Sequence, residues 1–172
     1  MPIISKIIDK IIRLEGKLVV FDFDRTILKI HSHCDGVTMH NIFSRNLLDD
    51  FASKNFKEVV ISLQKNNIRC AIASFGKKRI IKTYLFSLFH GEDNPILLDN
   101  NIQAAGNKLT KVQMLEKLRA GNFPPISSRN VLFFDDDEIN IQDSLRWGYV
   151  NSYLVPDGGL SDLYWENWLA KN

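Results

Sequence analysis

The sequence predicts an α/β fold in which helices cover both faces of a parallel sheet, a Rossmann-like, doubly wound arrangement. Short apolar runs predict buried strands at residues 17–23, 68–73 and 131–134. Amphipathic segments with helical spacing separate these runs, and strands that alternate with helices are typical of a parallel sheet. Polar residues follow each run, and ligands bind outside the carboxyl ends of the strands in such sheets. We therefore expect these polar residues to converge on one crevice.

The chain begins with an amphipathic segment. Residues 3–14 carry isoleucines and a leucine at helical spacing between charges of both signs, and Gly16 ends the pattern. We expect an extra N-terminal helix, at about residues 2–15, that packs on the core of the domain. Membrane association is the alternative and is not favoured, because a helix that binds membranes is usually rich in Lys and Arg.

The other predicted elements alternate along the rest of the chain. Further helices are expected at 52–65, 77–89, 109–118, 139–147 and 160–170, and further strands at 96–98 and 149–155. Residues 25–45 have no clean period and predict a loop. A chain of 172 residues is long enough for one domain with a sizeable core, so we expect a single domain over 1–172.

Composition excludes several classes of function. A net charge of +2 gives no argument for nucleic acid binding. Two cysteines make no disulfide framework, and no apolar stretch reaches the length of a membrane span. Charged residues interrupt the apolar N-terminus, so it does not resemble a signal peptide. We expect an intracellular, cytoplasmic protein by default, although a protein exported by a specialised secretion system would look the same. Composition leaves the oligomeric state open.

Two carboxylates lie two residues apart at the end of the first predicted strand. Asp22 and Asp24, buried so close together, would raise each other's pKa, and a bound cation is the simplest relief. An aspartate can carry a phosphoryl group, so Asp22 is the candidate nucleophile. Asp24 is the candidate general acid and base. The alternative is a strand followed by an ordinary polar turn.

A second acidic cluster follows the strand at 131–134. Carboxylates at this position suit a hard cation with oxygen ligands, such as Mg²⁺. We expect Asp136 to be a direct ligand and Asp135 to support it. Asp137 and Glu138 are expected to begin the next helix, where its dipole favours negative charge.

A serine and a lysine complete the set of candidate residues. Ser74 follows the strand at 68–73, so its hydroxyl can bind a phosphate oxygen with help from backbone N–H groups, or it can cap the next helix. A lysine beside a phosphate and two aspartates would balance charge and stabilise a transition state. Lys108 and Lys111 are rivals for this role, and spacing does not choose between them.

In order, the chain has Asp-x-Asp-x-Thr from Asp22, then Ser74, a lysine, and Asp-Asp-x-x-x-Asn from Asp135. This order resembles the four motifs of phosphatases of the haloacid dehalogenase (HAD) superfamily, and it is closest to the magnesium-dependent phosphatase family. The segments that carry the likeness are 71–74, 106–110, 133–141 and 147–159. The resemblance implies a HAD-like fold, gives the lysine role to Lys108, and implies that Asp22, the backbone carbonyl of Asp24 and Asp136 hold Mg²⁺.

The resemblance also implies a reaction. Asp22 would attack phosphorus to give an aspartyl phosphate, while Asp24 protonates the leaving oxygen and then activates water. Lys108, Ser74 and Phe75 would bind the phosphate, although the family often has a polar or basic residue where Phe75 stands.

The stretches before and after Ser74 are too short for a large cap domain.

An uncovered site can accept a phosphorylated side chain of a protein. We therefore expect a protein phosphatase, with phosphotyrosine favoured. A phosphatase of small molecules such as sugar phosphates is the alternative, and a catalytically silent HAD-like binding module is another.

Two further groups of residues have weaker signals. His31, His33, Cys34 and His40 fit no standard zinc pattern, so we expect a loop that borders the site. Within it, His33 is a candidate for contacting a phosphorylated ring together with Phe75. The aromatic residues of the last helix, Tyr164, Trp165 and Trp168, are expected to pack against the core.

Overall fold

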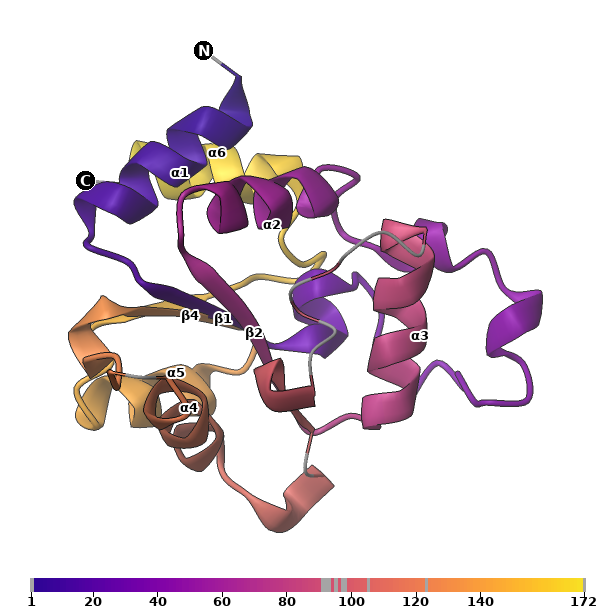
Figure 1. Ribbon diagram of the computed structural model, residues 1–172. Coiled ribbons are helices and arrows are strands. Elements are labelled where there is room, and N and C mark those ends of the chain that lie inside the picture. The colour runs from indigo at the N-terminus through magenta and orange to yellow at the C-terminus, as the bar shows by residue number, and fades with distance from the viewer. Residues whose placement is uncertain are drawn as a thin grey trace.

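The computed structural model describes residues 2–90, 94, 96, 99–104, 106–122 and 124–171. At the centre of these residues lies an all-parallel, five-stranded sheet with the strand order β3-β2-β1-β4-β5 (Figure 1). The strands are β1 (Leu18–Phe21), β2 (Arg69–Ser74), β3 (Ile102–Ala104), β4 (Val131–Asp135) and β5 (Asn151–Leu154). The predicted α/β fold is therefore confirmed.

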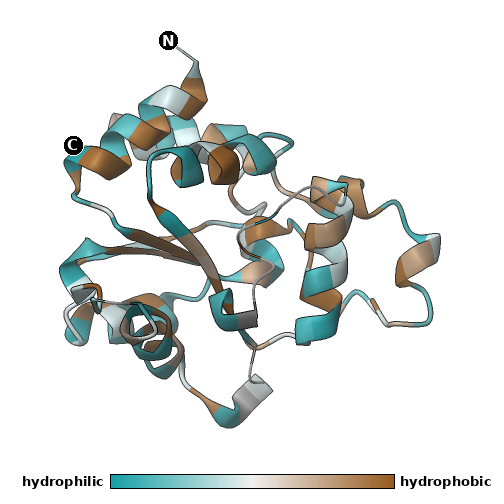
Figure 2. Cartoon of the chain, viewed as in Figure 1, coloured by the Kyte–Doolittle hydropathy of each residue, from teal (hydrophilic) through white to brown (hydrophobic). Residues whose placement is uncertain are grey.

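Helices cover both faces of the sheet (Figure 1). On one face lie α1 (Ile3–Arg13), α2 (Phe56–Lys65) and α6 (Asp162–Ala170), and on the other lie α4 (Lys111–Ala120) and α5 (Glu138–Arg146). The helix α3 (Lys78–Phe89) stands beside the β2 side of the sheet. Because both faces are covered, the central strands are apolar between their ends, and Figure 2 shows a hydrophobic centre. The polar residues of β2 and β4 stand at the strand ends, at Arg69, Ser74 and Asp135.

The side chains of each strand divide between two cores. In β1, Val19 and Phe21 join the core beneath α1, α2 and α6, whereas Leu18 and Val20 join the core beneath α4 and α5. This division follows from the two-residue period of a strand. Because both faces of the sheet lie in hydrophobic cores, polar side chains are found mainly where the strands end.

The first and last helices lie side by side. Three isoleucines of α1 are buried, namely Ile7, Ile8 and Ile11, so the prediction that this helix packs on the domain is confirmed. Lys10 of α1 donates a hydrogen bond to the backbone oxygen of Trp168 at 2.6 Å, and its ammonium lies 4.6 Å from the centre of the Trp168 ring. The aromatic residues of α6 are buried as predicted. None of the helices in the described ranges has the length and apolar character needed to cross a bilayer.

Two of the predicted strands differ from the structure. The strand predicted at 17–23 ends at Phe21, because the chain turns over Phe23–Ile27 with Arg25 at a positive φ of 56°. Of the strand predicted at 96–98, Leu97 and Leu98 lie outside the described residues. The strand β3 forms after them, at Ile102–Ala104, where the sequence predicted no element.

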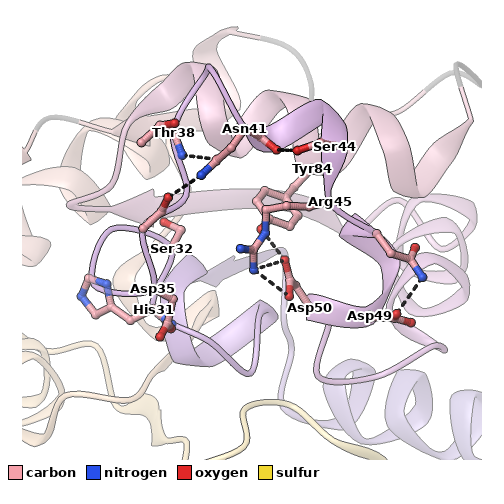
Figure 3. Close-up of polar contacts among 12 residues, drawn as sticks. His31, Ser32, Asp35, Thr38, Asn41, Ser44, Arg45, Asp49, Asp50 and Tyr84 are labelled. Carbon is pink, nitrogen blue, oxygen red and sulfur yellow. Dashed lines mark hydrogen bonds and ion pairs between the residues drawn. The ribbon is translucent and has the colours of Figure 1, made fainter.

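Residues 28–55 form a folded loop beside α3, which we call the 28–55 loop. It contains short 3₁₀ turns at Ile42–Ser44 and Leu47–Asp50. The buried carboxylate of Asp50 accepts a hydrogen bond from the Tyr84 hydroxyl of α3 at 2.5 Å, and Arg45 lies 3.4 Å from both of its oxygens (Figure 3). These contacts fix the end of the loop to α3, and its beginning lies at the carboxyl end of β1.

Candidate active site

The polar residues that follow β1, β2 and β4 line one cavity of about 440 Å³ at the carboxyl edge of the sheet. The start of α4 and the 28–55 loop complete its wall. We call it the acidic cavity. The sequence-based expectation that Asp22 and Asp24, Ser74, and Asp135 and Asp136 meet in one crevice is therefore met by the geometry.

Asp22 lies at the floor of this cavity and is only 6% exposed. Its backbone N–H donates to Phe134 at 2.8 Å, which extends the pairing of β1 with β4 by one residue and fixes the Asp22 backbone. Burial raises the pKa of the Asp22 carboxyl to about 7; Asp135 adds to the rise, and Lys111 opposes it. Its Oδ1 accepts a hydrogen bond from Lys111, and no described residue hydrogen-bonds to Oδ2. One oxygen of Asp22 is thus left to face a ligand.

Lys111 is the cation at the centre of the site. Its side chain is 2% exposed, and its ammonium contacts Asp22, lies 2.9 Å from Asp135 Oδ2 and donates to the backbone oxygen of Ala73 at 2.6 Å. Burial disfavours the charged form, but the carboxylates of Asp22 and Asp135 outweigh it and raise the pKa of Lys111 above its ordinary value. The lysine therefore stays positively charged at neutral pH.

The structure places Lys111, and not the predicted Lys108, beside the carboxylates. Lys108 is exposed in the turn before α4 and lines a neighbouring cavity rather than the acidic one. The reason is the start of α4: Thr110 and Gln113 form a capping box, which makes Lys111 the first residue of the helix. The helix N-terminus faces the carboxyl edge of the sheet, so it is Lys111 that reaches the carboxylates. The capping pattern was the sequence signal that could have distinguished the two lysines.

Asp24 lies above Asp22 in the turn that follows β1. Its Oδ1 accepts a hydrogen bond from the backbone N–H of Ser32 in the 28–55 loop at 2.7 Å. A Cβ at Gly76 would lie 3.5 Å from Asp24 Oδ2, so the turn after β2 closes on the other side of this carboxylate. Asp24 is half-buried and held between two loops, in reach of a group bound in the cavity.

The turn after β2 presents Ser74 and Phe75 to the cavity. The Ser74 hydroxyl oxygen accepts a hydrogen bond from the backbone N–H of Gly76 at 3.0 Å, which leaves the hydroxyl proton to donate elsewhere. Ser74 does not cap α3, because the N-cap position of that helix is Lys77. The Phe75 side chain is 41% exposed, and its ring centre lies 5.0 Å from the Lys111 ammonium.

The acidic cluster after β4 divides into residues with different tasks. Asp135 Oδ1 accepts hydrogen bonds from the Asp137 backbone at 2.8 Å and from the Asn140 side chain at 3.1 Å, while Oδ2 pairs with Lys111. Asp137 caps α5 by accepting from the Ile139 backbone at 2.8 Å. Asp136 is half-buried and lines the cavity, and burial together with Asp135 raises its pKa.

The histidine-rich part of the 28–55 loop borders the acidic cavity. His31 and His33 both line it, whereas Cys34 and His40 do not belong to its wall. His31 Nδ1 accepts a hydrogen bond from the Cys34 backbone at 3.3 Å. Within the part of the chain that the structure describes, no group of three or more His, Cys, Asp and Glu side chains is arranged around a metal position.

The acidic cavity nevertheless has the chemistry of a site for a hard cation. Among its described lining residues are five carboxylates and two permanent cations, namely Asp22, Asp24, Asp135, Asp136 and Asp137 against Arg25 and Lys111. Burial is the main cause of the raised pKa values of Asp22 and Asp136, and the charge of Asp135 adds to both. Asp135 is occupied by Lys111 and Asn140, so the fitting donors are the Asp22 and Asp136 carboxylates and the Asp24 backbone carbonyl. Mg²⁺ usually takes one or two carboxylates and keeps several waters, so this small oxygen set fits it.

Comparison with known proteins identifies one matching family. A family model described as Acid Phosphatase matches residues 15–172. No curated protein matches the chain. The matched residues begin just before β1 and include the whole sheet and every side chain that lines the acidic cavity, whereas α1 precedes them.

Proposed function

The chain belongs to the acid phosphatase family, a HAD-like family of magnesium-dependent phosphatases, and we propose that it hydrolyses phosphomonoesters through an aspartyl phosphate on Asp22. The observation that carries this proposal is the placement of Asp22. It is a buried carboxylate with one oxygen bound to Lys111 and the other facing a cavity that Asp24 also lines. A nucleophile, a cation and a second carboxylate in one cavity are the parts that phosphoryl transfer requires.

In the first step Asp22 Oδ2 attacks phosphorus in line, and the bond to the leaving oxygen breaks. Asp24 donates a proton to that oxygen as it leaves. In the second step Asp24, now ionised, takes a proton from a water that attacks phosphorus, and the bond between phosphorus and Asp22 Oδ2 breaks. The product is inorganic phosphate, and both carboxyls return to their starting states.

Two other side chains act on the phosphate oxygens. The Lys111 ammonium lies beside the nucleophile and offsets the negative charge that develops on the phosphoryl group. The Ser74 hydroxyl, whose oxygen already accepts a hydrogen bond from the Gly76 backbone, donates a hydrogen bond to a phosphate oxygen. Phe75 borders the phosphate site through its ring, and the phosphate-binding role of Lys108 passes to Lys111 in this proposal.

HAD-type phosphatases generally use Mg²⁺, and we propose that Asp22, Asp136 and the Asp24 carbonyl hold it here. When bound, it supplies positive charge that neutralises the phosphate and favours the ionised form of Asp22. Asp135 supports the site by holding Lys111 and the beginning of α5 in place.

Mg²⁺ is expected to stabilise the metal-free protein and to be required for hydrolysis of p-nitrophenyl phosphate. A cation present at 100 times its Kd stabilises the native state by about 2.7 kcal/mol. This raises the Tm of a domain of this size by roughly 5–10 °C. Thermal denaturation with and without Mg²⁺ measures the shift, and assays after chelation measure the requirement.

A matched pair of variants locates the cation. Asp136→Asn should lose most of the Mg²⁺-dependent rise in Tm, because it removes a ligand. Asp137→Asn, the same change one residue on, should keep the rise and should change stability little, because Asn caps a helix about as well as Asp. An equal rise in all three proteins contradicts the assignment, and no turnover by folded, Mg²⁺-loaded wild type contradicts the proposed reaction.

We propose that the substrate is a phosphorylated protein, with phosphotyrosine favoured over the alternative, a sugar phosphate. The support is the exposed Phe75 ring at the border of the acidic cavity, where the ring of a phosphotyrosine can pack against it. His33 is exposed on the opposite loop and lines the same cavity, so it is a second candidate contact.

Phosphotyrosine peptides are therefore expected to give a higher kcat/KM than glucose 6-phosphate. Phe75→Ser should lower kcat/KM for the peptides by about 2–10-fold, which corresponds to the loss of one aromatic contact. The same variant should affect the sugar phosphate less. Turnover of sugar phosphates alone would exclude the protein-phosphatase proposal while leaving the reaction itself intact.

A further inference from the structure

A second, larger cavity opens beside the acidic cavity, between the turn after β2 and the helices α4 and α5. It has a volume of about 880 Å³. We call it the α4–α5 groove. Both cavities share Phe75, Lys111 and Asn140 in their walls, so the groove is continuous with the place where the phosphate would lie.

Four of the twelve described residues that line the groove are apolar. The Trp147 side chain at the end of α5 is 68% exposed, and Phe75 is 41% exposed. Leu109 and Val112 add aliphatic surface. A volume within the roughly 300–1,000 Å³ of ligand pockets, bounded by exposed aromatic rings, is suited to a segment of extended chain.

The free charge of the groove is positive, because its acidic residues are already paired. Glu116 pairs with Arg119 at 2.6 Å and accepts a hydrogen bond from Tyr149, and Asp143 pairs with Arg146 at 3.1 Å. The two exposed lysines in its wall, Lys108 and Lys117, have no ion pair or hydrogen bond with any described residue.

We propose that the α4–α5 groove binds the acidic peptide segment that flanks the phosphorylated residue of a protein substrate. The inference rests on the proposed phosphatase function and adds to it the surface that selects the substrate. The phosphate of the phosphotyrosine enters the acidic cavity, and the phosphotyrosine ring packs against Phe75. The flanking peptide chain then crosses the groove towards Trp147. Lys108 and Lys117 then meet carboxylates of the peptide.

Two phosphotyrosine peptides that differ only in flanking Glu or Lys residues test this proposal. Wild type should give a kcat/KM about 3–10-fold higher for the Glu peptide, because each exposed ion pair contributes roughly 0.2–1 kcal/mol. The preference should weaken as ionic strength rises, since salt screens exposed charges. Equal values for the two peptides overturn the proposal.

Variants tie the preference to the groove. Lys117→Glu should reduce or reverse the ratio between the peptides, and Trp147→Ala should lower kcat/KM for both. Lys65→Glu makes the same charge change at the exposed end of α2, across the sheet, and should keep the wild-type ratio. If Lys65→Glu reduced the preference for the Glu peptide as much as Lys117→Glu does, the effect would come from the net charge of the protein. That result would overturn the proposal that the groove binds the peptide.

Turnover of p-nitrophenyl phosphate separates this inference from the proposed function. This substrate has no flanking chain, so it reports only on the fold and the acidic cavity. If wild type hydrolyses p-nitrophenyl phosphate but has equal kcat/KM values for the two peptides, the peptide-binding role of the groove is rejected and the proposed function is kept. Absence of turnover with every phosphomonoester rejects the proposed function.

Discussion

Replacing Asp22 with Asn is expected to lower kcat for p-nitrophenyl phosphate by at least about 10⁴-fold, because it removes the group that forms the covalent intermediate. The substitution keeps the size of the side chain and its place at the end of β1. It removes the negative charge and the attacking oxygen. Steady-state assays of the Mg²⁺-loaded protein measure the loss.

Two further variants test whether the loss of kcat in Asp22→Asn comes from loss of the nucleophile. Asp24→Asn keeps the nucleophile but removes the group that activates water, so it should release one equivalent of p-nitrophenol per protein and then stall. Asp22→Asn should release none. Asp9→Asn, an exposed aspartate of α1, should retain wild-type kcat. Substantial steady turnover by Asp22→Asn would be incompatible with an aspartyl phosphate at this position.

Replacing Lys111 with Met should affect both activity and stability. We expect kcat to fall by about 10²–10³-fold, as it does when one group that stabilises transition-state charge is removed. The buried carboxylates of Asp22 and Asp135 would lose their cation, and breaking a buried ion pair from one side costs about 3–5 kcal/mol of unfolding free energy. Kinetics and urea denaturation measure the two effects.

The matched variant Lys108→Met distinguishes the two lysines. Its side chain is exposed, so the free energy of unfolding should change by less than about 0.5 kcal/mol. Its kcat for p-nitrophenyl phosphate should fall far less than that of Lys111→Met. The opposite order of kcat values would return the catalytic role to Lys108. Mg²⁺ included in both assays offsets part of the charge imbalance and keeps Lys111→Met folded for the measurement.

Much of the fold and the site could be predicted because strand ends are visible in the sequence. Short apolar runs such as 131–134 are typical of buried strands, and Asp22 and Asp135 follow such runs directly. β3 was not predicted, since only Ile102 of its three residues is buried and the pattern is too short to show a period.

The parts of the site that were not predicted depend on contacts between distant segments. The capping box of Thr110 and Gln113 could have shown that α4 begins at Lys111, but the direction in which this first turn faces depends on how α4 packs against the sheet. The bond from Ser32 to Asp24 joins two loops without hydrophobic periodicity. Ser32 reaches Asp24 because of the path of the 28–55 loop, and the hydrogen bond between Asp50 and Tyr84 of α3 holds the end of that loop in place.

The arrangement of Lys111 between Asp22 and Asp135 also bears on how the protein folds. Asp22 follows β1, Lys111 begins α4 and Asp135 ends β4, so the three residues meet only when β1 is paired with β4 and α4 is packed against the sheet. Pairings between segments so far apart in sequence form slowly, because a long loop must close before any contact forms. A partly folded chain in which β1 and β4 are unpaired therefore lacks the contacts of Lys111 with Asp22 and Asp135.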